Sequence, residues 1–150
     1  MLRRVNGADR AAALAVLLGL IAAFVPWYSY MSATARVTVN GFRASLLGDL
    51  FFLAIAATAL LLLMRHRVIE DVISERLDER QAFSVVAAVA AGTVLLQLVL
   101  DAMGGGRSLG FGFLLAVFAA IALGVAAWLK RPREGARMTV RQMLQEDTFD

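Results

Sequence analysis

The sequence contains no cysteine and a single histidine, His66, which lies between two arginines. Without cysteine the chain can form no disulfide, no thiol nucleophile and no cysteine-based metal site. Without a second histidine it cannot supply the histidine ligands of a haem b bundle. The clusters of Asp, His or Ser that membrane peptidases and transferases need are also missing. We therefore expect a protein without metal or cofactor and without enzymatic activity.

Charge is missing from four long stretches of the chain. A helix needs about 20 apolar residues to cross about 30 Å of hydrocarbon, and backbone in lipid must form its hydrogen bonds within its own segment. With 60% hydrophobic residues and a mean hydropathy of +0.72, the chain is too apolar for a soluble domain. The sequence predicts an all-α membrane protein, a four-helix transmembrane bundle in residues 1–130 with spans at about 11–30, 46–64, 82–100 and 109–129.

The second span is the shortest, because only 15 uncharged residues separate Asp49 from Arg65. It is long enough if the helix begins near Ser45 and carries Asp49 in its first turn. The dipole of the helix favours an anion at that place. We therefore expect Asp49 to belong to the helix.

The basic residues are divided unequally between the segments that flank the spans. Twelve of the fifteen lie before the first span, between the second and third, or after the fourth; the others are Arg36, Arg43 and Arg107. The positive-inside rule then places both termini in the cytoplasm. A basic chain can bind nucleic acid, but these arginines flank spans, so we expect them to meet the lipid bilayer instead. The Arg-rich and Ala-rich composition is typical of GC-rich bacterial genomes and indicates a bacterial plasma membrane.

The first outer loop carries the dipeptide Asn40-Gly41 between alternating residues. This dipeptide favours the type I′ turn of a hairpin, since both central positions need a positive φ. Pairing across the turn would place Val37, Val39 and Phe42 on one apolar face, which could contact the helix ends or a partner. The alternative is a solvated connector. Next to this loop, we expect Trp27, Tyr28 and Tyr30 to form an aromatic belt at the outer end of the first helix.

Small residues recur every fourth position in three of the four spans. Such rows let helix backbones approach closely in a membrane, where hydrophobicity alone does not drive association. The alternative is that an alanine-rich composition produces these rows by chance. The predicted helix-packing positions are Ala15, Gly19 and Ala23 in the first span, Ala88 and Gly92 in the third, and Ala116, Ala120 and Gly124 in the fourth.

Gln97 is the one strongly polar side chain well inside a span. It lies four residues before Asp101 and therefore on the same helix face. We expect Gln97 to form an interhelical hydrogen bond; lining a substrate path is the alternative. Asp101 lies at the end of its helix, where the dipole disfavours an anion. It should therefore have a cationic partner, with Arg107, Arg36 and Arg43 in reach.

Two charged segments contain short apolar patterns. Residues 69–77 have one apolar helical face. This predicts that the second helix continues into the cytoplasm or that a short interfacial helix forms, and we expect the apolar face to contact protein. The tail, residues 131–150, has a capping box at residues 139–142 followed by an apolar face. Val140, Met143 and Leu144 form that face and could dock on a cytoplasmic partner, or fold back on the inner loop.

Two motifs, Pro26-Trp27-Tyr28 and Asn40-Gly41-Phe42, resemble those of small four-span bacterial membrane proteins in which an apolar first helix ends in a Pro-Trp-Tyr-like run. The resemblance covers about residues 10–64 and implies a four-span fold without a known active site. The expected order of elements, with a β element between the first two helices and both termini inside, is also similar to claudin-type architecture. However, the chain lacks the cysteine pair and the Trp-Gly-Leu-Trp signature of that family.

These patterns predict a non-enzymatic multi-pass membrane protein, an accessory or scaffolding subunit that contacts a membrane-protein partner. The alternative is a small transporter or channel subunit that acts as a homo-oligomer around Gln97. Small multidrug transporters carry an acidic residue in the middle of the first helix, and residues 11–25 contain none. A proton or ion path generally shows ionisable groups within the membrane, and the spans contain none between their interfacial ends.

The orientation can be tested with reporter fusions. The unequal division of basic residues predicts that a reporter at residue 150 lies inside the cell and a reporter near Gly105 lies outside. Paired alkaline phosphatase and fluorescent-protein fusions at each position measure this. An outside signal at residue 150 contradicts the four-span arrangement.

Overall fold

The computed structural model describes residues 6–66, 79–104 and 107–130. In these ranges it has four long helices: α1 (Gly7–Phe24), α3 (Leu46–Arg65), α4 (Glu79–Gly104) and α5 (Phe111–Leu129). All four are long and apolar enough to cross a membrane. The four-helix part of the predicted fold is thus confirmed, and a small sheet accompanies it. The predicted helix at residues 69–77 and the tail lie outside the described residues.

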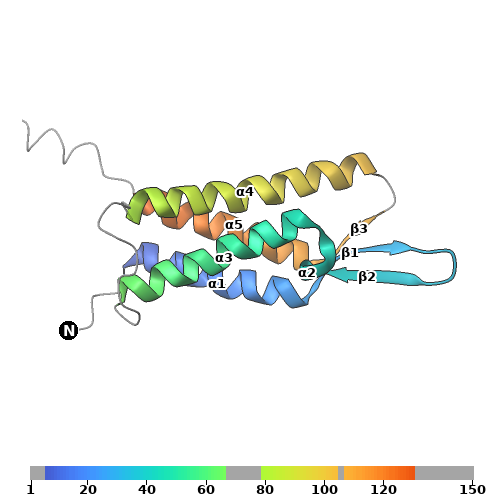
Figure 1. Cartoon of the computed structure of the whole chain (residues 1–150), viewed down its shortest axis with the longest axis horizontal. Coiled ribbons are helices and arrows are strands. Elements are labelled where there is room, and N and C mark those ends of the chain that lie inside the picture. Colours follow the sequence, from blue (N-terminus) through green and yellow to red (C-terminus); the bar gives the residue numbers. More distant parts are fainter. Residues whose placement is uncertain (1–5, 67–78, 105–106, 131–150) are drawn as a thin grey trace, which may run out of the picture.

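The helices run alternately in opposite directions along one bundle (Figure 1). The sheet lies at one end of the bundle, which we call the sheet end. The start of α1 and the end of α3 lie together at the other end, which we call the Asp9 end after a residue described below. Helices that follow one another along the chain therefore pack antiparallel.

The core is built on a close contact between α1 and α5, the most extensive in the bundle. Both helices present small side chains to each other. Ala12, Ala15 and Ala22 of α1, and Ala116 and Ala119 of α5, are fully buried or nearly so. Because alanine adds little width, the two backbones approach closely, as is typical of membrane helices.

Helix α1 ends at Phe24, six residues earlier than the sequence pattern predicts. The cause is Pro26, which disfavours helical backbone at the residue before it. Val25 accordingly has extended angles, φ −87° and ψ 145°. Pro26 then opens strand β1 (Pro26–Met31), in which Trp27 and Tyr28 are buried. The predicted aromatic belt is therefore wrong for these two residues, since they belong to the core.

The hairpin is formed by different residues from those predicted. Strand β1 pairs antiparallel with β2 (Arg36–Asn40), and the chain turns between them at residues 32–35, where Ser32 N donates to Ala35 O at 2.9 Å. A third strand, β3 (Ser108–Leu109), pairs with the other edge of β1. The strand order is β2-β1-β3.

The predicted turn at Asn40-Gly41 is wrong. Asn40 is extended and pairs with Pro26, and Gly41 begins a short helix, α2 (Gly41–Ala44). A Cβ on Gly41 would lie 2.6 Å from Phe52 Cζ and 2.8 Å from Trp27 Nε1. Glycine is needed here because two aromatic rings leave no room for a side chain. A positive φ is not the reason.

Helix α3 begins as the sequence predicts. Ser45 is its N-cap, and the hydroxyl accepts a hydrogen bond from Gly48 N at 3.4 Å. Asp49 lies in the first turn. A serine cap satisfies one of the amides that the start of a helix leaves unpaired.

The predicted small-residue rows separate into two groups. Ala15, Gly19 and Ala23 of α1 and Ala116 and Ala120 of α5 are buried. Three other positions are exposed: Ala88 and Gly92 of α4 and Gly124 of α5. For these three the prediction of packing within the bundle is wrong. In α4 the cause is that Phe83, Ala87, Ala90 and Val94 form the buried face instead.

We expect Gly19→Ala to destabilise the protein and Gly124→Ala not to do so. A Cβ on Gly19 would lie 2.6 Å from Ile55 Cγ1 and 2.7 Å from Ile55 Cδ1, and Ile55 is itself buried. A Cβ on Gly124 meets nothing within 4 Å. Overpacking of this kind costs about 1–3 kcal/mol. Thermal unfolding in detergent measures the difference, and equal midpoints for the two variants contradict it.

Candidate functional site

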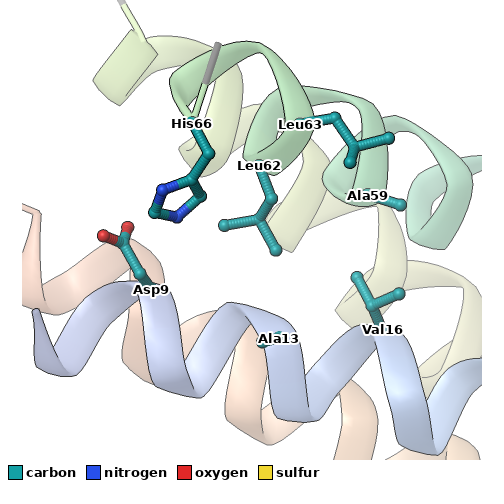
Figure 2. Close-up of a pocket in the computed structure, with 7 residues that line it drawn as sticks. All are labelled: Asp9, Ala13, Val16, Ala59, Leu62, Leu63 and His66. Carbon is teal, nitrogen blue, oxygen red and sulfur yellow. The ribbon is translucent and has the colours of Figure 1, made fainter. Parts of the chain in front are cut away.

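A pocket lies between α1 and α3 at the Asp9 end of the bundle. Its volume is about 550 Å³. Five aliphatic side chains line it: Ala13, Val16, Ala59, Leu62 and Leu63. Two polar side chains, Asp9 and His66, complete the lining, and Figure 2 shows both at the same end of the pocket. The site thus combines an apolar body with one polar end.

Local sequence signals place the two polar groups. Asn6 caps α1, its side-chain oxygen accepting hydrogen bonds from Ala8 N at 3.0 Å and Asp9 N at 3.3 Å. Asp9 therefore lies in the first turn, where the helix dipole favours an anion. His66 is the C-cap of α3. Because α1 and α3 run in opposite directions, the start of one meets the end of the other.

Asp9 carries a buried charge, since its side chain is only 2% exposed. Two cations offset it. Arg65 Nε lies 3.2 Å from Asp9 Oδ1, and Lys130 Nζ lies 3.8 Å from the same oxygen. Lys130 also lies over the ring of Phe83, 3.5 Å from its centroid. The ends of α3 and α5 are in this way tied to the start of α1.

The oxygen that receives these ion pairs has no hydrogen bond. Within the described residues, Asp9 Oδ1 is buried and has no hydrogen-bond partner. A buried acceptor without a donor costs free energy. The polar end of the pocket is thus a buried carboxylate whose charge Arg65 and Lys130 offset.

A second polar cluster lies near the sheet end. Ser45 Oγ donates to Gln97 Oε1 at 2.8 Å, and Gln97 Nε2 donates to Asp101 Oδ1 at 3.1 Å. Arg107 Nη1 lies 3.5 Å from Asp101 Oδ1, and its guanidinium lies 5.0 Å from the centre of the Tyr28 ring. The expected interhelical hydrogen bond of Gln97 and the cationic partner of Asp101 are both present.

The predicted partner-contact residues lie partly in the core. Val39 is half-buried and packs on the core opposite Tyr28, and Val37 is half-buried opposite Tyr30. Phe42 is 54% exposed, with its ring centre 5.0 Å from that of Phe52. Val140, Met143 and Leu144 lie outside the described residues.

The sequence reading missed Asp9. It lies between arginines before the first uncharged stretch, in a segment that resembles a solvated flank. The local signal was Asn6 as a helix cap, which places Asp9 in the first turn of α1. Its contact with the end of α3 depends on tertiary packing that no local pattern encodes.

Comparisons with known proteins give no relative: no family model, no curated protein and no solved structure matches the chain. The resemblance to small four-span bacterial proteins therefore rests on its two short motifs. Within the part of the chain that the structure describes, no group of three or more His, Cys, Asp or Glu residues could hold a metal ion.

We expect Asp9→Asn to destabilise the protein more than Arg10→Gln. The first change leaves the positive charges of Arg65 and Lys130 beside a neutral amide, and loss of one partner of a buried ion pair costs about 3–5 kcal/mol. Arg10 is exposed, and substitutions at such positions change stability by about 0.5 kcal/mol or less. Denaturation in detergent measures both variants. An equal loss would show that the Asp9 ion pairs contribute nothing specific.

Proposed function

We propose that this chain is a non-enzymatic accessory or scaffolding subunit of a membrane complex. The observation that carries the proposal is an exposed row of small residues on α4, formed by Ser84, Ala88 and Gly92. These positions lie on the face of α4 that the bundle leaves open. In a membrane such a row is the type of surface on which another helix packs closely.

The surroundings of Gly92 support this assignment. A Cβ placed on Gly92 meets nothing within 4 Å, so glycine is not needed there for packing inside the bundle. Glycine also weakens a helix relative to alanine. A position that faces only lipid does not need glycine, because larger aliphatic residues suit lipid contact. Exposed residues of this kind, such as Val85 and Leu95, surround Gly92. A helix of a partner protein benefits from the space that a glycine leaves.

The sheet end supplies a second surface. Strand β2 lies at the edge of the sheet, so one side of its backbone is open to another strand. Phe42 lies in α2, which follows this strand directly, and is more than half exposed. A partner that packs on α4 and reaches beyond the helices could contact β2 and Phe42.

The proposed location is a bacterial plasma membrane with both termini in the cytoplasm. The described cations at the Asp9 end, Arg10, Arg65, Arg80 and Lys130, are those assigned to the cytoplasm. Arg36, Arg43 and Arg107 belong to the sheet end. This division supports an orientation in which the sheet lies outside the cell.

The alternative, a small transporter or channel subunit, depends on Gln97. The hydrogen bonds of Gln97 with Ser45 and Asp101 support a structural role instead. Interhelical hydrogen bonds in membranes contribute about 0.6 kcal/mol on average and up to about 1.7 kcal/mol. Gln97→Leu should therefore cost little stability and leave partner binding unchanged.

The absence of cysteine makes the partner surface directly testable. We expect Gly92→Cys, labelled in native membranes with a maleimide–diazirine cross-linker, to give one discrete product with a different protein. Ala56→Cys is the matched control, because Ala56 is a small exposed residue near the middle of α3. Electrophoresis and mass spectrometry of the products compare the two positions.

Three outcomes contradict the proposal. One is equal cross-linking at both positions, and another is the absence of any product at Gly92→Cys. The third is a product that contains only copies of this chain, together with liposome flux that Gln97→Leu abolishes. That result assigns the chain to the transporter or channel class.

A further inference from the structure

The four helices form two sides of the bundle that differ in apolar length. Helix α1 packs on α3 and α5, and α4 packs on the same two helices. We therefore call α1 and α3 the short side and α4 and α5, opposite them, the long side. Figure 1 shows α4 extending past the start of α3 at the sheet end. Lipid around the bundle thus meets helices of different length on its two sides.

The apolar length of the short side is limited by charged residues. On α3, the exposed residue Asp49 is separated from Arg65 by 15 uncharged residues, which cover about 22 Å at 1.5 Å per residue. Asp49 belongs to the exposed face of the helix, since Leu53, four residues later, is exposed too. On α1, the uncharged residues that follow the exposed Arg10 end at Phe24 and cover about 21 Å.

The long side presents a longer apolar face. Exposed apolar side chains of α4 extend from Val85 to Met103, over about 28 Å. Asp101 does not interrupt this face, because its side chain is only 5% exposed and accepts a hydrogen bond from Gln97. Helix α5 has exposed apolar side chains at both ends and is also about 28 Å long. This length is close to the hydrocarbon thickness of about 30 Å.

A bilayer of ordinary thickness therefore fits the long side but not the short side. Beside α3 it would place the Asp49 carboxylate, or the cations at the Asp9 end, in hydrocarbon, where ionised groups are costly. Lysine and arginine can extend along a helix to reach the headgroups. Aspartate cannot, because its carboxylate is one methylene group from the backbone. A thinner bilayer beside α1 and α3 removes this mismatch.

We propose that the short side thins the bilayer by about 8 Å and collects phospholipids with short acyl chains, while the long side meets a bilayer of ordinary thickness. The chain in this way imposes a step in thickness on the membrane around it. Its partner surface on this reading is a lipid of matching chain length, selected by the distance between charges on α3.

This inference rests on the four membrane-spanning helices and not on the proposed protein partner. The small-residue row assigned to that partner lies on α4, whereas the short side is formed by α1 and α3. The test below uses the isolated chain without any partner. The two proposals can therefore fail independently.

The test measures which lipid contacts each side of the full chain. The probe is a vesicle of equal parts dimyristoleoyl and dierucoyl phosphatidylcholine, in which either the short-chain or the long-chain lipid is brominated and quenches tryptophan on contact. The reporters are Ala56→Trp on the short side and Ile121→Trp on the long side, both at exposed positions near the middle of their helices. Both also carry Trp128→Phe, so that the buried Trp27 is the only other tryptophan.

We expect the short-chain lipid to be enriched beside Ala56→Trp roughly threefold over its share beside Ile121→Trp. The reason is that each ångström of mismatch has a modest free-energy cost, which a lipid of matching length avoids.

A pair of variants connects the enrichment to the charge on α3. Asp49→Leu makes α3 uncharged from Leu46 to Met64, over about 28 Å, and should remove the enrichment beside Ala56→Trp. Arg36→Leu is the control, because it removes an exposed charge from the sheet and leaves the helices unchanged. It should preserve the enrichment. The comparison of the two reporters does not depend on either variant.

Three results overturn the proposal. Equal shares of the short-chain lipid beside the two reporters show that the bilayer has one thickness around the bundle. Enrichment that persists in Asp49→Leu shows that the charge on α3 does not set the thickness. Enrichment that Arg36→Leu removes as well shows an effect of net charge and not of apolar length.

Discussion

The indole of Trp27 holds together the sheet end of the bundle. Its Nε1 donates a hydrogen bond to Ala22 O at 2.9 Å, in the last turn of α1. The last carbonyls of a helix have no partner within the helix, so this bond satisfies one of them. The ring is only 1% exposed and lies against Phe51, Phe52 and Phe113. One side chain thus connects the end of α1 with the starts of α3 and α5.

The backbone around Trp27 connects the sheet to the start of α5. Gly110 N donates to Trp27 O at 2.6 Å, immediately before α5 begins. A Cβ on Gly110 would collide with the carbonyl of Pro26, and a Cβ on Gly112 would collide with the carbonyl of Val25. The short strands of the sheet therefore take part in the helix packing, and β1 fixes the position of α5 against α1.

This arrangement explains where the proposed functional surfaces lie. The alanine contact between α1 and α5 and the aromatic cluster around Trp27 make the interior of the bundle. Helix α4 packs through its face with Phe83, Ala87, Ala90 and Val94 and leaves its small-residue row exposed. At the opposite end, a pocket between α1 and α3 ends at Asp9. The small-residue row and the pocket consequently lie on different helices.

Much of this fold could be predicted, because the length of an apolar stretch and the residues that cap a helix are local signals in the sequence. The four helices, the Ser45 cap and the bond of Gln97 followed from such signals. The sheet was misplaced because Pro26-Trp27-Tyr28 reads as the end of a membrane helix, while its pairing with residues 36–40 and 108–109 depends on tertiary contacts. Asp9 was missed for the same reason, since its partners Arg65 and Lys130 are distant in sequence. Which small-residue row faces inward was likewise decided by competing aromatic residues such as Phe83.

The most direct test of the structural account compares the two tryptophans. Trp27→Phe removes the bond to Ala22 and part of a buried ring, which should cost about 1–3 kcal/mol or more of unfolding free energy. Trp128 is 67% exposed, so Trp128→Phe should have almost no effect. Unfolding in detergent measures both changes. A loss of stability in Trp27→Phe alone supports the account, and equal stability of the two variants contradicts it.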